Sequence, residues 1–518
     1  MARTLGISTR SAGNLALLEL ENLDRFGVYT RLHFEDKSYQ NLDELRFAGS
    51  LAHLLRNYGL GAGDRALVMM PNSPELMATF PAVWTIGASI IPVIPQWTAA
   101  EVANILTDSE ASVVLTAPSH VQRLQEAMQM AGVQKQLLVF GESPAAAATN
   151  ISPLISQLPP IETPVDCAPS DLAILLYTSG TTGKPKGVVL THGNMRAALD
   201  GAYLQNPGLE RGPMLHSLPL THVYGVLVQH VANLWGWSTV LLPQFEPTRA
   251  LQAIERHRVR YLPLVPTMAV YLLRHPERKR FDTSSLFRIT SGGAALPDQL
   301  RRSLEAAFQC RVDQGYGLSE SASVATGYEA TVPYRPGSVG QAVPGVELCI
   351  MDDTGEQLPP GQTGEVCVSG PNVTTGYWRN PEATGQALTG KWLRTGDVGY
   401  LDEEGYLFIT DRKKDLIIKG GENISPREIE EALYQHPQIV EAAVIGLPDP
   451  VFGEQICAVV QLTPGSALSE DDIRQHVGRY VTKFKVPARV VFRSTLPKNN
   501  NGKILKREIR AELLQKVP

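Results

Sequence analysis

Residues 172–192 read LAILLYTSGTTGKPKGVVLTH, two apolar runs separated by a loop rich in glycine, hydroxyl and lysine side chains. The apolar runs at 172–177 and 187–192 predict two strands, so the loop joins strand to strand. A P-loop has a wider glycine spacing and a lysine that opens a helix, whereas Lys184 is followed by Pro185. The loop is therefore not a P-loop, but its glycines, hydroxyls and lysines supply the donors and positive charge that a polyphosphate needs.

The segments on either side of this loop alternate between strand and helix patterns. Residues 66–70 and 112–117 predict short buried strands, and 287–296 predicts a strand that runs into a glycine turn. The helix that follows should bury Leu304 and Phe308. Strands separated by helices predict parallel sheets with ligands at the carboxyl ends of the strands. By contrast, the Pro-, Ala- and Ser-rich stretch 143–169 predicts a long surface loop.

The pattern changes after about residue 345 to short strands with glycine turns, and a self-contained α+β unit follows residue 411. In that unit, SPRE at 425–428 predicts a capping box with Ser425 as the N-cap. We therefore predict an α/β fold with a large N-terminal domain (1–411) of βα-sheets plus a small β-barrel-like part. A small α+β C-terminal domain (412–518) follows a hinge near 412–415.

Composition narrows the class of protein. A chain of 518 residues is too long for one ordinary core, and a net charge of −5 argues against a general nucleic-acid binder. Five cysteines without metal-ligand spacing suit a reducing compartment. We find neither a signal-peptide pattern at the N-terminus nor an apolar run of the roughly 20 residues that a membrane span needs. We therefore expect a cytoplasmic enzyme.

The loop resembles the phosphate loop of the acyl-adenylate-forming enzymes, which include acyl-CoA synthetases, luciferase and peptide-synthetase adenylation domains. Further motifs match that family in order along the chain, namely PLTHVYG (219–225), SGGAAL (291–296), QGYGLSES (314–321), LRTGD (393–397), DRKKD (411–415), KGGENISPREIE (419–430) and NGKILKREI (501–509). Each motif alone is weak evidence for this family, but the whole set in this order is specific to it. The resemblance implies a two-step reaction in which a carboxylate is joined to AMP with release of pyrophosphate and then transferred to a thiol.

The resemblance implies ATP and Mg²⁺ as ligands of the site. Asp397 would accept hydrogen bonds from the ribose, Tyr316 would stack on adenine, and Glu320 would be the Mg²⁺ ligand. The full set of residues implied for ATP or AMP binding is Thr178, Ser179, Gly180, Thr181, Thr182, Gly183, Lys184, Lys186, Gly293, Ala294, Ala295, Gln314, Gly315, Tyr316, Gly317, Ser319, Asp397 and Arg412.

The resemblance also implies the catalytic residues. Lys503 would bridge the substrate carboxylate and the α-phosphate, and His222 would gate the carboxylate between the two half-reactions. Lys414 resembles the hinge residue about which the C-terminal domain rotates. Gly420 and Gly421 would line a tunnel for coenzyme A, although Ile418 stands where many CoA ligases carry a lysine.

The acyl pocket is expected at His222, Tyr224, Gly292 and Gly293. Residues 221–237 contain no acidic side chain to hold an α-amine, which disfavours an amino-acid substrate. We therefore expect a hydrophobic fatty or aryl acid as substrate, with ATP and CoA. An acyl-AMP ligase that loads a carrier protein and a catalytically silent binding protein remain alternatives, a luciferase-type oxygenase is remoter, and a homodimer is left open.

Overall fold

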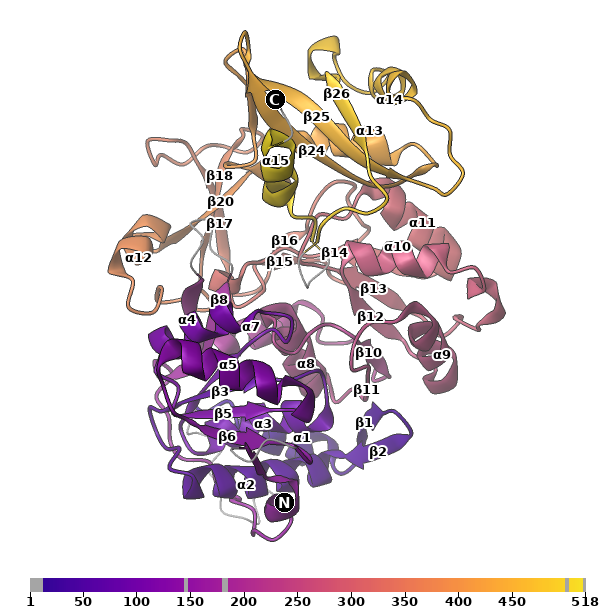
Figure 1. Cartoon of the computed structure of the whole chain (residues 1–518). Coiled ribbons are helices and arrows are strands. Elements are labelled where there is room, and N and C mark those ends of the chain that lie inside the picture. The colour runs from indigo at the N-terminus through magenta and orange to yellow at the C-terminus, as the bar shows by residue number, and fades with distance from the viewer. Residues whose placement is uncertain (1–12, 144–147, 179–184, 499–502, 516–518) are drawn as a thin grey trace.

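Two seven-stranded sheets form the framework of the N-terminal part of the chain (Figure 1). The structure is a computed structural model that describes residues 13–143, 148–178, 185–498 and 503–515. The first sheet is parallel except for its β8–β9 hairpin. In spatial order it consists of β7 (Ala148–Asn150), β6 (Gln136–Val139), β5 (Val113–Thr116), β3 (Arg65–Met69), β4 (Ser89–Pro92), β8 (Leu172–Thr178) and β9 (Lys186–Thr191).

The second sheet is parallel except for its β1–β2 hairpin. Its parallel strands bring several chain segments with glycine turns to one edge, as the strand–helix alternation predicts. In spatial order it consists of β14 (Arg311–Gln314), β13 (Arg288–Ser291), β12 (Tyr261–Leu264), β10 (Met214–His216), β11 (Thr239–Leu241), β1 (Thr30–Phe34) and β2 (Lys37–Gln40).

Helices cover both sheets through apolar faces. One face of the first sheet packs in a single core with α2 (Asn41–Asn57), α3 (Pro74–Thr85), α7 (His192–Gln205) and α8 (Val223–Trp235). The other face packs on α4 (Ala99–Ser109) and α5 (Val121–Ala131). The second sheet packs on α9 (Pro247–His257), α10 (Pro266–Arg274) and α11 (Asp298–Phe308). Leu304 and Phe308 of α11 are buried, as their helical spacing predicts.

The stretch predicted as a plain surface loop contains regular structure. Strand β7 and the short helix α6 (Ser152–Ile155) lie within it, so that prediction is wrong for residues 148–155. The reason is that Ile151 and Ile155, one helical turn apart, are both buried in the core. The Pro- and Ser-rich composition around them concealed this short apolar pattern.

A smaller antiparallel sheet follows the two large ones and corresponds to the predicted small β part. It consists of β17 (Glu347–Met351), β18 (Gly364–Ser369), β20 (Trp392–Leu401), β19 (Leu388–Thr389) and β21 (Leu407–Arg412), the last paired with β20. The C-terminal lobe has its own sheet of β23 (Glu422–Ile424), β22 (Ile417–Lys419), β25 (Gly453–Leu462), β24 (Ile439–Asp449) and β26 (Arg489–Phe492). Three helices pack on it, namely α13 (Pro426–Tyr434), α14 (Glu470–Val477) and α15 (Lys506–Gln515).

The architecture confirms the predicted fold class of a large α/β N-terminal domain followed by a small α+β unit. Figure 1 shows the C-terminal lobe, in yellow, seated above α10 and α11, where Arg274 donates to the backbone oxygen of Ile439 at 3.2 Å. The predicted boundary near 411–415 covers the end of β21 and the turn before β22, and its position stays a prediction. Across the ranges that the structure describes, no helix is both long and apolar enough to cross a bilayer.

Helix α13 begins at Pro426 as predicted, but its capping differs from the prediction. Ser425 makes no side-chain cap to its own helix, and its hydroxyl instead donates to Asp411 Oδ2 at 2.7 Å. The same carboxylate oxygen accepts from the backbone nitrogen of Arg427 at 3.1 Å. An aspartate from the hinge segment therefore caps the helix, which no local sequence pattern could indicate.

Candidate functional site

The glycine-rich loop spans a β8–β9 hairpin, with Thr178 paired to Lys186 across the two strands. Both of these residues line the larger of two adjoining cavities, and Lys186 Nζ lies 5.4 Å from the ring centroid of Tyr377. Six of the predicted phosphate contacts lie outside the described residues, namely Ser179, Gly180, Thr181, Thr182, Gly183 and Lys184.

The larger cavity, of about 840 Å³, lies between α8, the carboxyl ends of β13 and β14, and the loop after Tyr316. A second cavity of about 710 Å³ opens between this edge and the C-terminal lobe, and it includes Ala294, Ala295 and Asp397. The residues that line both cavities are Val265, Gly293, Gln314, Gly315, Tyr316, Gly317, Arg412, Lys414, Lys503, Leu505 and Glu508. The structure therefore gathers residues from motifs far apart in sequence around one space at the strand ends.

Glycines allow the backbone to line this space closely. Gly293 has a φ of 77°, a left-handed conformation that favours glycine. A Cβ at Gly317 would overlap the backbone oxygen of Ser323, and one at Gly315 would lie 3.0 Å from the oxygen of Thr326. Backbone groups thus form a flat edge that side chains would obstruct, a surface suited to the edge of a base.

Gln314 supports this edge from behind. Its buried amide oxygen accepts from the backbone nitrogen of Leu296 at 3.2 Å, and its amide nitrogen donates to the hydroxyl of Tyr334 at 3.0 Å. These bonds tie the loop after β13 to the end of β14. The Gln314 side chain therefore positions the two loops that carry the glycines.

Tyr316 and Arg412 form a polar cluster around the buried carboxylate of Asp397, beside the glycine edge. The Tyr316 hydroxyl donates to Asp397 Oδ2 at 2.6 Å, and Arg412 Nε lies 2.9 Å from Asp397 Oδ1. Burial and the Asp397 carboxylate hold the pKa of the Tyr316 phenol well above its usual value. Both carboxylate oxygens of Asp397 thus face hydrogen-bond donors, as a group that receives the two hydroxyls of a ribose should.

Lys503 and Lys414 bring two ammonium groups to the same space from the C-terminal part of the chain. Burial lowers the pKa of Lys503 to about 8, and nearby Arg412 acts in the same direction. Burial also lowers the pKa of Lys414. This concentration of partly desolvated positive charge favours the arrival of anions, because they would restore the pKa of these lysines toward its ordinary value.

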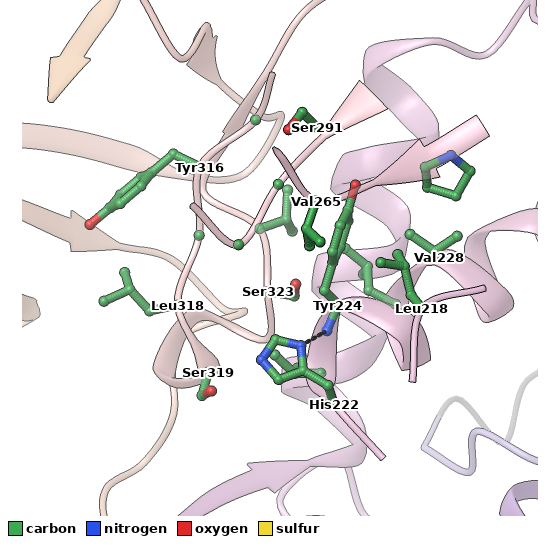
Figure 2. Close-up of a pocket in the computed structure, with 18 of the residues that line it drawn as sticks. Leu218, His222, Tyr224, Val228, Val265, Ser291, Tyr316, Leu318, Ser319 and Ser323 are labelled. Atoms are coloured by element: carbon green, nitrogen blue, oxygen red, sulfur yellow. Dashed lines mark hydrogen bonds between the residues drawn. The ribbon is translucent and has the colours of Figure 1, made fainter. Parts of the chain in front are cut away.

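His222 and Tyr224 come from the start of α8 (Figure 2). His222 is the N-cap residue, and its Nδ1 accepts from the backbone nitrogen of Tyr224 at 3.2 Å. Burial lowers the pKa of His222 to about 4, so its ring is neutral at pH 7. The Tyr224 ring lies against Gly292, where a Cβ would stand 3.0 Å from Tyr224 Cζ. Figure 2 shows both side chains in the pocket, with Val265 beside Tyr224.

Glu320 lies in a short 3₁₀ turn (Ser319–Ser321), and both Ser319 and Glu320 line the larger cavity. Glu320 Oε1 accepts from the Tyr377 hydroxyl at 2.7 Å. Among the described residues, no group of three or more His, Cys, Asp or Glu side chains is placed to hold a metal ion. Glu320 supplies one carboxylate beside the hairpin, and Mg²⁺ carried on nucleotide phosphates needs only one or two protein carboxylates.

Gly420 and Gly421 form the turn of the β22–β23 hairpin, with φ values of 60° and 85°. Gly420 lies beside Phe452 and Phe484, and neither glycine is among the residues that line the two cavities described above. Their predicted part in a tunnel for coenzyme A therefore stays a prediction and requires movement of the C-terminal lobe.

Two residues of the site were not predicted from the sequence. Tyr377 links Glu320 to the hairpin through its hydroxyl and through the contact of its ring with Lys186. Asp411 supplies the cap of α13 at the joint between the lobes. Tyr377 stands in TTGYW, where a tyrosine after a glycine was the only available signal. Neither role can be read from spacing, because each depends on segments that are distant in the chain.

Comparison with known proteins agrees with this geometry. The family model described as AMP-binding enzyme matches residues 21–378, and the one described as AMP-binding enzyme C-terminal domain matches 428–503. A long-chain-fatty-acid–CoA ligase of Bacillus subtilis is 34% identical over 94% of this chain and 92% of its own length. A feruloyl-CoA synthase of an Amycolatopsis species is 35% identical over 90% and 92%.

Solved structures show the same architecture. The ATP-bound MatB of Rhodopseudomonas palustris superposes with a TM-score of 0.87 at 30% identity, covering 97% of this chain and 99% of that one. The similarity thus extends over both lobes and over the motifs that line the cavities. The chain therefore belongs to the AMP-binding enzymes, in the acyl-CoA ligase branch of the acyl-adenylate-forming superfamily.

Proposed function

We propose that this enzyme is an ATP- and Mg²⁺-dependent carboxylic acid–CoA ligase that acts on a hydrophobic fatty or aryl acid. The supporting observation is the convergence of Lys503, Arg412 and Lys414 with Asp397 and Glu320 at the edge of a cavity that continues between α8 and the second sheet. The three cations, an aspartate that can accept from a ribose and a glutamate that can bind a metal ion all lie beside a cavity that can hold an acyl group. No simpler nucleotide-binding role needs all of them.

In the first half-reaction, a carboxylate oxygen of the acid attacks the α-phosphorus of ATP. The bond from that phosphorus to the bridging oxygen of the β-phosphate breaks, and pyrophosphate leaves. The two anionic reactants repel each other, so Lys503 would stand between them and stabilise the charge of the transition state. Its pKa of about 8 leaves it mostly protonated at pH 7, and bound anions would favour that form further.

Different residues of the site would bind the ribose, the base and the phosphates of ATP. Asp397 would accept from the ribose, Tyr316 would lie on the base, and Thr178 and Lys186 would meet the phosphates from the hairpin. Glu320 would hold Mg²⁺, which neutralises phosphate charge when bound. His222, neutral and anchored as the cap of α8, would orient the carboxylate without adding charge.

In the second half-reaction, the sulfur of coenzyme A attacks the acyl carbonyl carbon and its thiol proton passes to solvent. The bond from that carbon to the phosphate oxygen of AMP breaks, and AMP leaves with the electrons of that bond. Lys503 has no part in this step and would occupy the approach to the carbonyl. We propose that the C-terminal lobe turns about Lys414, which withdraws Lys503 and brings the Gly420–Gly421 turn to the site. Glycines at that turn would let the pantetheine arm pass close to the backbone.

The test is pyrophosphate release with a panel of carboxylic acids, with and without CoA. We expect release that depends on the acid and an acyl-CoA product when CoA is present. Release without a CoA thioester would instead favour loading of a carrier-protein thiol. No release with any acid of a broad panel would favour a silent binding protein of this fold.

A further inference from the structure

The two lobes meet not only at the hinge but also at a surface that we call the lobe interface. On one side of it lie α10 and α11, which pack on the second sheet, and on the other side lie α13 and β24 of the C-terminal lobe (Figure 1). The side chains that cross this surface, described below, stand outside all the motifs quoted from the sequence. The motifs therefore assign them no task.

The first contact is a cap that one lobe supplies to a helix of the other. Helix α11 begins after Pro297, which offers no side-chain cap. Glu431, on α13, accepts through Oε2 from the backbone nitrogen of Asp298, the first residue of α11, at 3.4 Å. A carboxylate is favoured there because a helix N-terminus has free N–H groups and a partial positive charge. The start of α11 is therefore completed from across the lobe interface.

The charges around this cap are balanced. Asp298 carries its own carboxylate, which by itself would repel Glu431. Arg301 and Arg302 offset that charge, with their Nε atoms 2.9 and 2.7 Å from the two oxygens of Asp298. On the other side, Arg427 Nε lies 3.9 Å from Glu431 Oε1. Three guanidinium groups thus surround two carboxylates, and the Glu431 carboxylate lies at the helix start without net repulsion.

Helix α10 supplies two further contacts. Arg274, at its end, donates to the backbone oxygen of Ile439 at 3.2 Å, where β24 begins. Lys498 of the C-terminal lobe lies over the ring of Tyr271, with its Nζ 5.4 Å from the ring centroid. Glu441 holds the same ammonium at 2.6 Å. Contacts from both α10 and α11 therefore hold the C-terminal lobe in its present orientation.

The side of the C-terminal lobe that makes these contacts is the one that presents Lys503 to the site. Glu431 and Lys503 both line the second cavity, whereas Gly420 and Gly421 line neither cavity. A lobe that turns as one body to bring the glycine turn to the site must therefore carry Glu431 away from α11. The contacts of the lobe interface belong to the orientation of the first half-reaction and must separate before the second.

We infer that Glu431 and Arg274 are positioning residues that set the balance between the two half-reactions, because they hold the lobe in the orientation that places Lys503 in the site. The inference rests on the proposed ligase function and on the turn about Lys414. Loss of either contact should lower the population of this orientation without altering the groups that react.

The test compares the two half-reactions in each variant of the full-length enzyme. Single-turnover pyrophosphate release, with the acid of the panel that reacts fastest, gives the rate of the first. Thioester formation from the matching acyl-adenylate and CoA gives the rate of the second. When each orientation performs one half-reaction, the ratio of the two rates follows the ratio of the two populations. Partial loss of folding lowers both rates alike and leaves this ratio unchanged.

Glu431→Ala should lower the ratio of the first rate to the second by about fivefold, the effect of losing a helix cap. Arg274→Ala should lower it by about threefold, because a bond from an exposed guanidinium contributes less. The double variant should lower it by about fifteenfold, since the two contacts share no residue. Glu431→Gln keeps an acceptor oxygen and should restore most of the ratio.

Two variants that remove ion pairs within a single lobe are the matched controls. Glu428 lies on α13 like Glu431, but it pairs with Lys485 of its own lobe at 2.6 Å. Arg256 pairs with Asp36 in the N-terminal part at 3.3 Å. Glu428→Ala and Arg256→Ala should therefore leave the ratio unchanged.

An unchanged or higher ratio in the double variant would overturn the inference and leave the ligase function intact. An equal fall of the ratio in Glu428→Ala would also overturn it, because the effect would then not come from the lobe interface. Failure of the ligase function itself would look different, since the unaltered enzyme would release no pyrophosphate with any acid of the panel.

Discussion

The Tyr316 hydroxyl lies 2.6 Å from Asp397 Oδ2, while Arg412 approaches the other oxygen of the same carboxylate at 2.9 Å. Asp397 belongs to β20 of the small sheet, and Tyr316 follows β14 of the second large sheet. This bond therefore joins two sheets across the proposed nucleotide site. It also orients the carboxylate before any nucleotide arrives.

We expect Asp397→Asn to weaken ATP binding by roughly 10- to 100-fold, because hydrogen bonds to a charged group contribute about 1.5–3 kcal/mol. Tyr316→Phe keeps the ring and removes only one neutral donor, so its effect should stay within about tenfold. Calorimetric titration with ATP measures both. An equal loss in the two variants would mean that the phenol, not the carboxylate, makes the decisive contact.

Lys503→Ala should abolish acid-dependent pyrophosphate release, at a cost of several kcal/mol in the transition state. The same variant should still form the thioester from acyl-adenylate supplied directly, because the second step uses the lobe in another orientation. Product analysis after each half-reaction separates the two. Lys391→Ala, which removes a surface ion pair with Glu347, is the matched control. Loss of both half-reactions would contradict the rotation.

The pH dependence of the first half-reaction follows from Lys503. Its pKa is lowered to about 8, and the protonated form is the one that bridges the two anions. The kcat/KM for ATP, with ATP bound first, should therefore be constant well below pH 8 and fall about tenfold per unit above it, because this parameter reports the enzyme without bound anions. A rate that rises between pH 8 and 9.5 would show that the neutral amine is the active form.

His222 has two roles that substitution can separate. Asparagine is a good N-cap, so His222→Asn should keep the stability of α8 while removing the imidazole from the site. His222→Ala loses both and should cost about 1 kcal/mol of unfolding free energy in addition. Thermal unfolding reports the cap, and the two half-reactions report the imidazole. If His222→Asn retains full activity in both steps, the imidazole has no gating role.

Gly317 tests the close packing of the glycine edge. A Cβ there would overlap the backbone oxygen of Ser323, so Gly317→Ala should weaken ATP binding by at least about tenfold and lower the melting temperature. Gly385 in α12 (Pro381–Ala387) has no heavy atom within 4 Å of an added Cβ. Gly385→Ala should therefore be neutral or stabilise by up to about 1 kcal/mol. A Gly317→Ala enzyme with normal ATP affinity would show that the loop adjusts freely.

The features that the sequence predicted well are those that follow from the order of segments along the chain. Strand–helix alternation gave the parallel sheets, and the ordered motifs named Gly317, Glu320 and Asp397, which the structure brings to two adjoining cavities. The sequence could not predict Tyr377 or Asp411. Each of these depends on which side chain of a distant segment comes to lie opposite, and no local spacing encodes that.

The cap of α13 has a mechanical consequence for the joint between the lobes. Asp411 stands on β21, before Lys414, while the donors that it holds, Ser425 and the backbone of Arg427, lie after it. If the C-terminal lobe turns about Lys414, the hydrogen bonds from Ser425 and Arg427 to Asp411 must break, and α13 then loses its N-terminal cap. Asp411 then helps to hold the resting orientation of the enzyme, together with the bond of Arg274 to Ile439, and the second half-reaction would require its release.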